Sequence, residues 1–211
     1  MTTEPSPSLE IERKYDVDAD TPLPDWSGMP GVARIGEPEP RELDARYLDT
    51  ADAHLAGSLT ALRRRSGGPD AGWHIKRSTP EGKLETHFAL DETTDAEADP
   101  IVPDAVLAAL AEIAVPPFVV LARIRNSRTA YALQDAAGGV VAEFVDDRVT
   151  ATDVRRGVET SWREWELELG PAAPADPAGR AALFAAADAR VTAAGGRVSA
   201  SASKLGRALG L

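Results

Sequence analysis

Five short segments of the chain repeat charged side chains at every second position, and this pattern constrains the fold more than any other feature. Successive side chains of a β-strand point to opposite faces, so residues two apart share one face. Any one such face is typical of a solvated edge strand, but like charges two apart repel, and mixed signs cost less on a wet face. Five such faces together predict strands around an interior whose charge is completed by a ligand. They are Glu10, Glu12 and Lys14; Arg63 and Arg65; His74 and Lys76; Arg123 and Arg125; and Glu164, Glu166 and Glu168.

Short alternating segments bounded by turn residues occupy most of the chain and predict an antiparallel sheet of eight or more strands. They cover residues 9–17, 42–49, 60–65, 72–78, 83–90, 118–128, 130–134, 140–145, 149–154 and 161–169. Helical spacing is confined to 104–114, to 177–194 after the N-cap candidate Asp176, and to a last turn at 203–209. Many strands with few helices favour an α+β fold, an antiparallel β-barrel with helices packed outside.

The length of 211 residues suits one domain, which we expect over residues 9–211 after a disordered tail at 1–8. The chain has no cysteine, which excludes thiolate chemistry and cysteine metal sites. No run of 18 apolar residues predicts a membrane-spanning helix, so a cytoplasmic protein is expected. The net charge of −11 argues against a nucleic-acid partner.

Only four of the 23 basic residues are lysines, which makes each lysine a candidate for a role that needs a compact ammonium group. Lys14, Lys76 and Lys204 are such candidates, whereas Lys83 is predicted to be a solvated surface residue. Acidic residues gather at 91–99. A barrel lined by both charge types explains the strands, because carboxylates bind hard divalent cations and guanidinium groups bind phosphate oxygens.

Several motifs, taken in order, resemble the CYTH superfamily, also called triphosphate tunnel metalloenzymes. Glu10-Ile11-Glu12-Arg13-Lys14 looks like the ExExK signature of that superfamily. The remaining matches cover nearly the whole chain: Tyr47-Leu48-Asp49-Thr50, Leu62-Arg63-Arg64-Arg65, Trp73-His74-Ile75-Lys76, Arg123-Ile124-Arg125, the late Glu-x-Glu, and Ser203-Lys204. The resemblance implies an eight-stranded antiparallel tunnel and an Mg²⁺- or Mn²⁺-dependent reaction on a linear triphosphate.

Carried over residue by residue, the resemblance assigns roles to the charged faces. The residues expected to carry the reaction are Glu10, Glu12, Lys14 and Lys76. Phosphate oxygens are assigned to Lys14, Arg63, Arg65, Lys76, Arg123, Arg125 and Lys204. Metal ligands are assigned to Glu10, Glu12, Asp147 and the late glutamates Glu164, Glu166 and Glu168, with Glu85 and Glu143 as further candidates. Which two of the late glutamates bind the metal stays open at this level.

The leading hypothesis is hydrolysis of inorganic triphosphate to pyrophosphate and phosphate by a monomer or homodimer, with no nucleic-acid or membrane partner. One alternative is a thiamine- or nucleoside-triphosphate hydrolase or a class IV adenylyl cyclase, although no aromatic cluster marks a site for a base. Another is a non-catalytic module that binds polyphosphate. The carboxylates favour an enzyme, because anion binding alone has no need for them.

Overall fold

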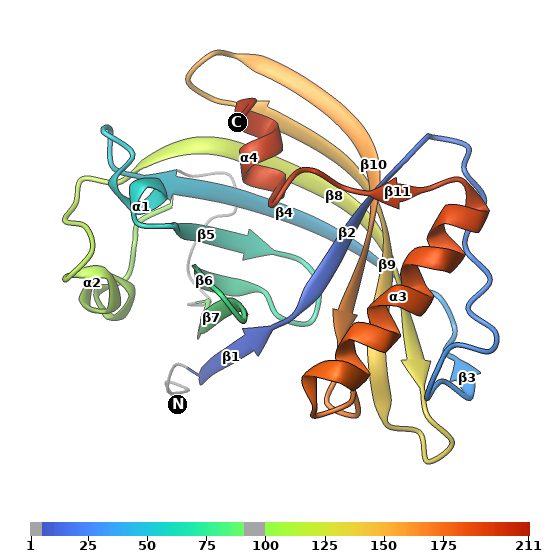
Figure 1. The fold of residues 1–211 in the computed structure, drawn as a ribbon. Coiled ribbons are helices and arrows are strands. Elements are labelled where there is room, and N and C mark those ends of the chain that lie inside the picture. The colour runs from blue at the N-terminus through green and yellow to red at the C-terminus, as the bar shows by residue number, and fades with distance from the viewer. Residues whose placement is uncertain (1–5, 91–99) are drawn as a thin grey trace.

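A computed structural model describes residues 6–90 and 100–211, and all of the described strands belong to one antiparallel sheet. The strands, in chain order, are β1 (Ser6–Glu10), β2 (Glu12–Val17), β3 (Arg34–Ile35), β4 (Glu39–Asp49), β5 (Thr60–Ser66), β6 (Gly72–Thr79), β7 (Gly82–Ala89), β8 (Val119–Gln134), β9 (Val140–Asp153), β10 (Val158–Leu169) and β11 (Arg197–Val198). Figure 1 shows the long strands curling around a common interior.

The sheet is closed by its first two strands. The strand order in the sheet is β1-β7-β6-β5-β4-β8-β9-β10-β2-β11. Strand β1 lies at one end of this order and β2 lies next to the two-residue β11 at the other, although only Ile11 separates β1 from β2 in the chain. The Ile11 carbonyl accepts a hydrogen bond of 2.9 Å from the backbone N–H of Leu169. Because the chain passes directly from one end to the other, the sheet forms a barrel, and the single strand predicted over 9–17 is two.

The predicted eight-stranded antiparallel barrel is confirmed when β1 and β2 are counted together as one strand beside the seven strands β4 to β10. The two-residue strands β3 and β11 are additions that the sequence did not predict. The segments predicted separately at 118–128 and 130–134 form the continuous β8, and those at 140–145 and 149–154 form β9. Strand β1 pairs with β7 from Ser6 onward, so described structure includes residues 6–8 of the predicted tail. The limits of the domain stay a prediction.

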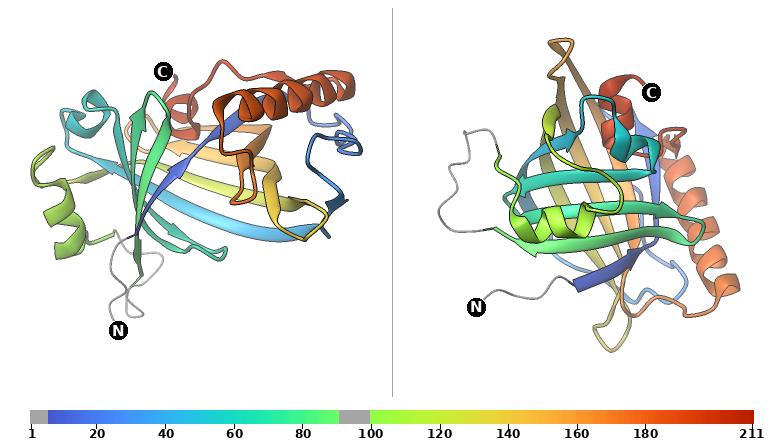
Figure 2. Two further views of the ribbon diagram at one scale, coloured as in Figure 1. Left: turned by 60° about the horizontal axis from the view of Figure 1, so that its bottom comes forward. Right: turned by 90° about the vertical axis from the view of Figure 1, so that its left-hand side faces the viewer.

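Two helices cover the outer face of the barrel, as the sequence predicted. Helix α3 (Pro177–Ala194) begins where the Asp176 carboxylate accepts a 2.8 Å hydrogen bond from the Gly179 N–H and ends at Gly195, whose φ of 101° suits glycine. Its apolar side packs on outward side chains of β2, β9 and β10, which include Tyr15 and Trp165. Helix α2 (Asp104–Leu110) packs on the outside of β5, β6 and β7 (Figure 2).

The last helix corrects the prediction that the helices lie outside. Helix α4 (Lys204–Leu209) packs its Leu205 and Ala208 against Ala45 and Ile124, which belong to the inner faces of β4 and β8. Short helix α1 (His54–Gly57) lies beside this end of the barrel. The two helices therefore narrow one end of the interior instead of extending the outer layer.

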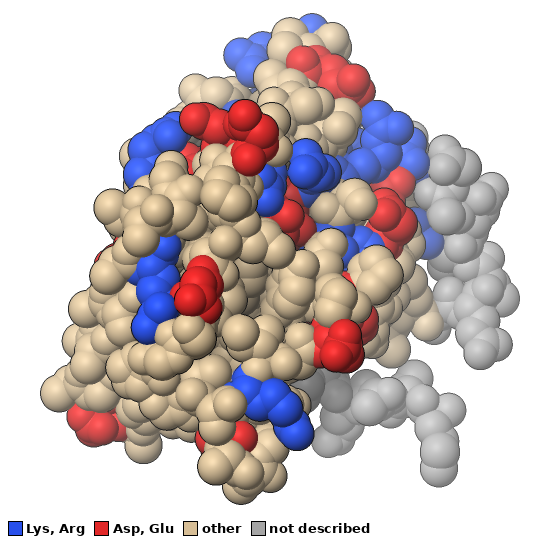
Figure 3. Space-filling view, turned by 90° about the vertical axis from the view of Figure 1, so that its right-hand side faces the viewer, with Lys and Arg blue, Asp and Glu red and all other residues tan. Residues whose placement is uncertain are grey.

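The outer surface beside α3 carries charges of both signs scattered among uncharged residues (Figure 3). The acidic stretch 91–99 lies outside the described residues. None of the described helices has the length and apolar character needed to cross a lipid bilayer.

Candidate functional site

The inward faces of the strands enclose a cavity of about 810 Å³, which we call the tunnel. Charged side chains of both signs line it because each strand presents alternate residues to the interior. Those among its lining residues are Glu10, Glu12, Lys14, Arg41, Arg63, Arg65, Asp70, Lys76, Lys83, Arg128, Glu143, Arg155, Glu166, Glu168 and Lys204. The predicted residues Glu10, Glu12, Lys14, Arg63, Arg65, Lys76, Glu166, Glu168 and Lys204 thus share one cavity.

Three of the predicted metal ligands form a compact group on β9 and β10, which we call the Lys204 cluster. Carboxylate oxygens of Asp147, Glu164 and Glu166 all lie within 4.8 Å of one another, a spacing that could hold a metal ion. The ammonium of Lys204 contacts all three, at 2.8, 2.6 and 2.8 Å respectively. Arg128 adds ion pairs of 2.7 Å to Asp147 and 2.9 Å to Glu166.

The charges of this cluster balance one another. Burial alone would raise the pKa of Glu166, but Lys14, Lys204 and Arg128 together lower it well below its usual range. For the Lys204 ammonium, burial alone would lower the pKa, but the three carboxylates raise it well above its ordinary value. Glu166 and Lys204 therefore both stay charged at neutral pH, and the cluster carries its own counter-ions.

A second group of carboxylates lies where β1 passes into β2, and we call it the Glu168 cluster. It consists of Glu10, Glu12 and Glu168, and Glu168 is the register partner of Glu12 across β2 and β10. Glu12 pairs with Lys83 at 2.5 Å and with Lys14 at 3.1 Å, and Glu10 pairs with Lys76 at 2.5 Å.

Glu168 differs from Glu10 and Glu12 because its carboxylate has no ion-pair partner among residues 6–90 and 100–211. Burial, and next the negative charges of Glu10 and Glu12, raise its pKa to about 7, although Lys76 opposes the shift. Carboxylate oxygens suit a hard divalent cation such as Mg²⁺ or Mn²⁺. Because Glu168 has no ion-pair partner among the described residues, the Glu168 cluster is a second candidate for the predicted metal.

The wall formed by β5 and β6 carries the basic side chains. Arg63 and Arg65 point into the tunnel from β5, and Lys76 points inward from β6. Burial would raise the pKa of Tyr47 on β4, but the neighbouring Arg63 lowers it. The opposite wall adds Lys14 and Arg128, so that cations face the cavity from both sides.

Two predicted phosphate ligands, Arg123 and Arg125, lie on the face of β8 that points away from the tunnel. Arg125 is about half exposed and pairs with Glu159 at 3.2 Å, and Arg123 pairs with Asp44 at 2.5 Å. Neither lines the tunnel, because the inward residues of β8 are Ile124, Asn126 and Arg128. The pairing of β8 with β4 shifts register between Tyr47 and Leu48, and alternation alone does not say which face is interior.

Several tunnel residues were missed by the sequence analysis. Arg128 ends the strand predicted over 118–128 but was assigned no role. Arg41 lies just before the strand predicted over 42–49, and only the structure shows that it is the register partner of Arg128. Lys83 was predicted to be a solvated residue, but it lines the tunnel and pairs with Glu12. Its position two residues before Glu85 in an alternating strand could have indicated this.

The remaining predicted candidates are held by basic groups. Glu143 pairs with Arg41 at 3.0 Å. Buried Glu85 on β7 lies 2.5 Å from Lys76 and 3.7 Å from Arg63.

The residues of the Tyr-x-Asp-Thr segment, Tyr47 to Thr50, have two different structural roles. Tyr47 lines the tunnel, whereas the Asp49 carboxylate accepts hydrogen bonds from the N–H groups of Leu55 and Ala56 at 2.9 and 3.0 Å. The Thr50 hydroxyl oxygen accepts a 3.0 Å bond from the His54 N–H. Asp49 and Thr50 therefore hold α1 at the end of the tunnel.

Sequence comparison finds curated relatives of this chain. A protein of Mycobacterium tuberculosis, of uncharacterized function and present in two strains, is 38% identical over an alignment of 176 residues. This alignment covers 78% of this chain and 34% of that protein. The chain thus spans about a third of the length of these relatives.

Solved structures share the fold at low sequence identity. An adenylate cyclase candidate from Bacillus halodurans matches with a TM-score of 0.60 and 17% identity over 95% of this chain and 97% of that chain. An adenylyl cyclase candidate from Hippeastrum with a dominant triphosphatase activity matches with a TM-score of 0.50 and 18% identity over 96% of both chains. The CYTH domain model matches residues 8–188. With this match and the closed, charge-lined barrel, the chain belongs to the CYTH domain family.

Proposed function

We propose that the chain hydrolyses inorganic triphosphate to pyrophosphate and phosphate with the help of Mg²⁺ or Mn²⁺. The observation that carries the proposal is that one tunnel contains both the Glu168 cluster and a set of inward cations on facing walls. Carboxylates and phosphates repel, so a site that gathers both needs a cation between them. The triphosphatase activity of the Hippeastrum protein, which has the same fold, supports this assignment.

The basic residues act by positioning and by electrostatics. Arg63, Arg65 and Lys76 bind phosphate oxygens from the β5–β6 wall, while Lys14 and Arg128 bind them from the other side. A linear triphosphate held from two sides is aligned for in-line attack by water. Charge that develops on the phosphate oxygens in the transition state meets cations already in place, in a cavity shielded from bulk water.

The metal side is assigned to Glu10, Glu12 and Glu168. A divalent cation bound there supplies Lewis-acid stabilisation of the phosphate oxygens. Glu164, Glu166 and Asp147, also predicted as metal ligands, serve in this proposal to hold Lys204, Arg128 and Lys14 in place. Of the predicted phosphate ligands, Arg123 and Arg125 are replaced by Arg128 and Arg41.

The test is phosphate release, measured with malachite green, from inorganic triphosphate in the presence of Mg²⁺ or Mn²⁺. We expect Glu12→Gln and Lys14→Ala each to lower kcat by about 10²- to 10³-fold, because each removes a charge that contacts the metal or the phosphate. Glu159→Gln, on the exposed outer side, is the matched control and should retain wild-type turnover. Circular dichroism checks that the variants fold, and wild-type turnover in both tunnel variants would falsify the proposal.

The same assay separates the alternatives. Binding of triphosphate or long-chain polyphosphate without metal-stimulated phosphate release would favour a binding module. Formation of cyclic AMP from ATP would favour a cyclase.

One observation favours organic triphosphates as a second substrate class. The end of the tunnel beside α1 and α4 is apolar, and its lining includes Ala56, Leu59, Leu121, Leu209 and Leu211. Leu59 is 67% exposed and has a φ of 53°, so an apolar side chain is held at the mouth by an uncommon backbone conformation. An organic group attached to the triphosphate could pack there. Including ATP and thiamine triphosphate in the assay tests this class, and a higher kcat/KM than for inorganic triphosphate would establish it.

A further inference from the structure

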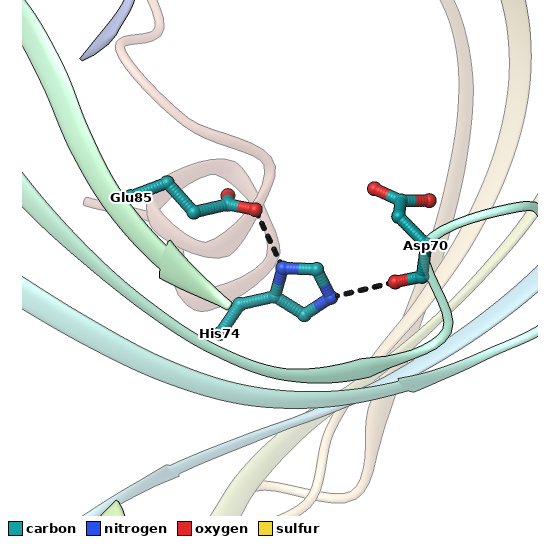
Figure 4. Close-up of side chains that lie close together, drawn as sticks. All are labelled: Asp70, His74 and Glu85. Carbon is teal, nitrogen blue, oxygen red and sulfur yellow. Dashed lines mark hydrogen bonds and ion pairs between the residues drawn. The ribbon is translucent and has the colours of Figure 1, made fainter. Parts of the chain in front are cut away.

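His74 is a fully buried histidine of β6 that lies between two hydrogen-bond acceptors (Figure 4). Its Nδ1 lies 2.6 Å from Oε1 of Glu85, and its Nε2 lies 3.0 Å from the backbone carbonyl oxygen of Asp70. It shares the inward face of β6 with Lys76, two residues along, but it does not reach the tunnel itself. Any effect of His74 on a bound ligand must therefore pass through the groups that it touches.

Glu85 connects His74 to the basic wall of the tunnel. While its Oε1 contacts the imidazole, its Oε2 lies 2.5 Å from the Lys76 ammonium and 3.7 Å from a terminal nitrogen of Arg63. Burial would raise the pKa of Glu85, but the hydrogen bond with His74 and the charges of Lys76 and Arg63 lower it, so the carboxylate stays ionised. One buried carboxylate thus orients two cations that line the tunnel.

The other end of the network is anchored in the turn between β5 and β6. Gly67 and Gly68 have φ values of 77° and 74°, and a Cβ at Gly67 would lie 1.9 Å from the carbonyl oxygen of Glu42. This turn brings the Asp70 carbonyl to His74, and the Asp70 carboxylate forms an ion pair with Arg65. The turn, His74 and Glu85 therefore form a continuous support behind the basic wall.

We propose that His74 is a positioning residue, which fixes the rotamer of Glu85 and through it the place of Lys76 and Arg63 in the tunnel. The inference rests on the proposed function, in which these two cations bind phosphate. Lysine has a flexible four-carbon stem, so its ammonium needs fixed partners to hold one position. Lys76 also contacts Glu10 at 2.5 Å, but Glu10 is a candidate metal ligand, which leaves Glu85 as the partner that serves the cations alone.

A neutral imidazole has one N–H, which we place on Nδ1, facing the Glu85 carboxylate. A pair of substitutions separates this hydrogen bond from the contact of Nε2 with the Asp70 carbonyl. The amide nitrogen of asparagine can replace Nδ1 of histidine, so His74→Asn keeps a donor towards Glu85 and loses the contact with Asp70. Glutamine reaches instead to the position of Nε2, so His74→Gln keeps the Asp70 contact and leaves Glu85 without its donor. If His74 only fills space in the interior, the two variants should behave alike.

We expect His74→Gln to lower kcat for inorganic triphosphate by about 10- to 100-fold, the usual cost of losing a partner that orients a functional group. His74→Asn should stay within a few-fold of wild type. His54→Gln, an exposed histidine on α1, is the control and should show no change. Equal losses in the Asn and Gln variants, with equal urea midpoints, would overturn the proposal.

A second readout does not depend on catalysis. Because the chain has only four lysines, ¹⁵Nζ spectra of lysine-labelled protein contain few signals, which single substitutions assign. His74→Gln should shift the Lys76 signal, as Glu85→Gln does, while the signal of Lys204, held by its own cluster, stays in place. An unmoved Lys76 signal contradicts the positioning role even in a folded variant. If the wild type releases no phosphate but the Lys76 signal moves, the proposed function fails while the structural coupling stands.

Discussion

The Lys204 cluster and the Glu168 cluster contain the same number of carboxylates in one tunnel, but they differ in how their charge is balanced. Asp147, Glu164 and Glu166 converge on the Lys204 ammonium and are contacted by three further basic groups, those of Lys14, Arg128 and Arg207. In the Glu168 cluster, two carboxylates pair with lysines, and Glu168 has no ion-pair partner in the part of the chain that the structure describes. The charge of the compact Lys204 cluster is thus already neutralised by basic side chains. The Glu168 cluster keeps one carboxylate, that of Glu168, without an ion-pair partner among the described residues.

This difference shows that the spacing of carboxylates alone does not identify a metal site. A cation entering the Lys204 cluster would have to displace Lys204 from three buried carboxylates, which costs the strong charge-assisted contacts that it makes. A cation entering the Glu168 cluster meets a carboxylate whose pKa has been raised to about 7 by burial and by Glu10 and Glu12. Electrostatics therefore favours binding of a cation at the Glu168 cluster over binding at the Lys204 cluster.

The largest expected effect tests whether Lys204 is a structural counter-ion. Lys204→Met should lower the free energy of unfolding by about 3–5 kcal/mol, because it removes the one ammonium that contacts all three buried carboxylates. Lys83→Met, which removes a more exposed ammonium from Glu12, is the matched control and should cost much less. Urea unfolding followed by circular dichroism measures both. Equal losses in the two variants would contradict the comparison.

The next effect concerns where the metal binds. Glu168→Gln should weaken Mn²⁺ binding by at least about 10- to 100-fold, because that is already the cost of losing a group that only orients a metal ligand. Glu164→Gln should change the affinity much less, because Glu164 is engaged by Lys204 at 2.6 Å. Isothermal titration calorimetry with Mn²⁺ alone gives both constants. A greater loss in Glu164→Gln would assign the metal to the Lys204 cluster.

The smallest effect is a pH dependence of metal affinity. Because the pKa of Glu168 is raised from 4.5 to about 7, its proton must leave before the carboxylate can bind a cation. Mn²⁺ affinity should therefore be full above about pH 7 and fall on acidification by up to about tenfold per pH unit. Titrations at pH 6, 7 and 8 measure this. Glu168→Gln should flatten the profile, and equal affinity of the wild type at pH 6 and 8 would be the contrary outcome.

The sequence indicated the barrel and much of the tunnel because alternation is a local property. Glu10 and Glu12 share a face in any extended strand, and the same holds for Arg63 and Arg65. Alternation does not indicate which face of a strand turns inward, however. For this reason the sequence assigned Arg125 of β8 to the tunnel, whereas in the structure Arg128 lines the tunnel and Arg125 does not. The shift in register beside Tyr47 is a property of two paired strands, which neither strand shows alone.

The sequence by itself indicated that its charged strand faces surround a shared interior, because five such faces occur together and like charges two residues apart repel on a solvated surface. Only the tertiary structure decided how those charges meet. It inserted α4 into one end of the barrel, so that Lys204 neutralises residues that lie far earlier in the chain, and it left Glu168 without such a partner among the described residues. The reason is physical: the pKa and the free energy of a buried charge depend on neighbours brought together by folding, and these cannot be deduced from the position of the charge along one strand.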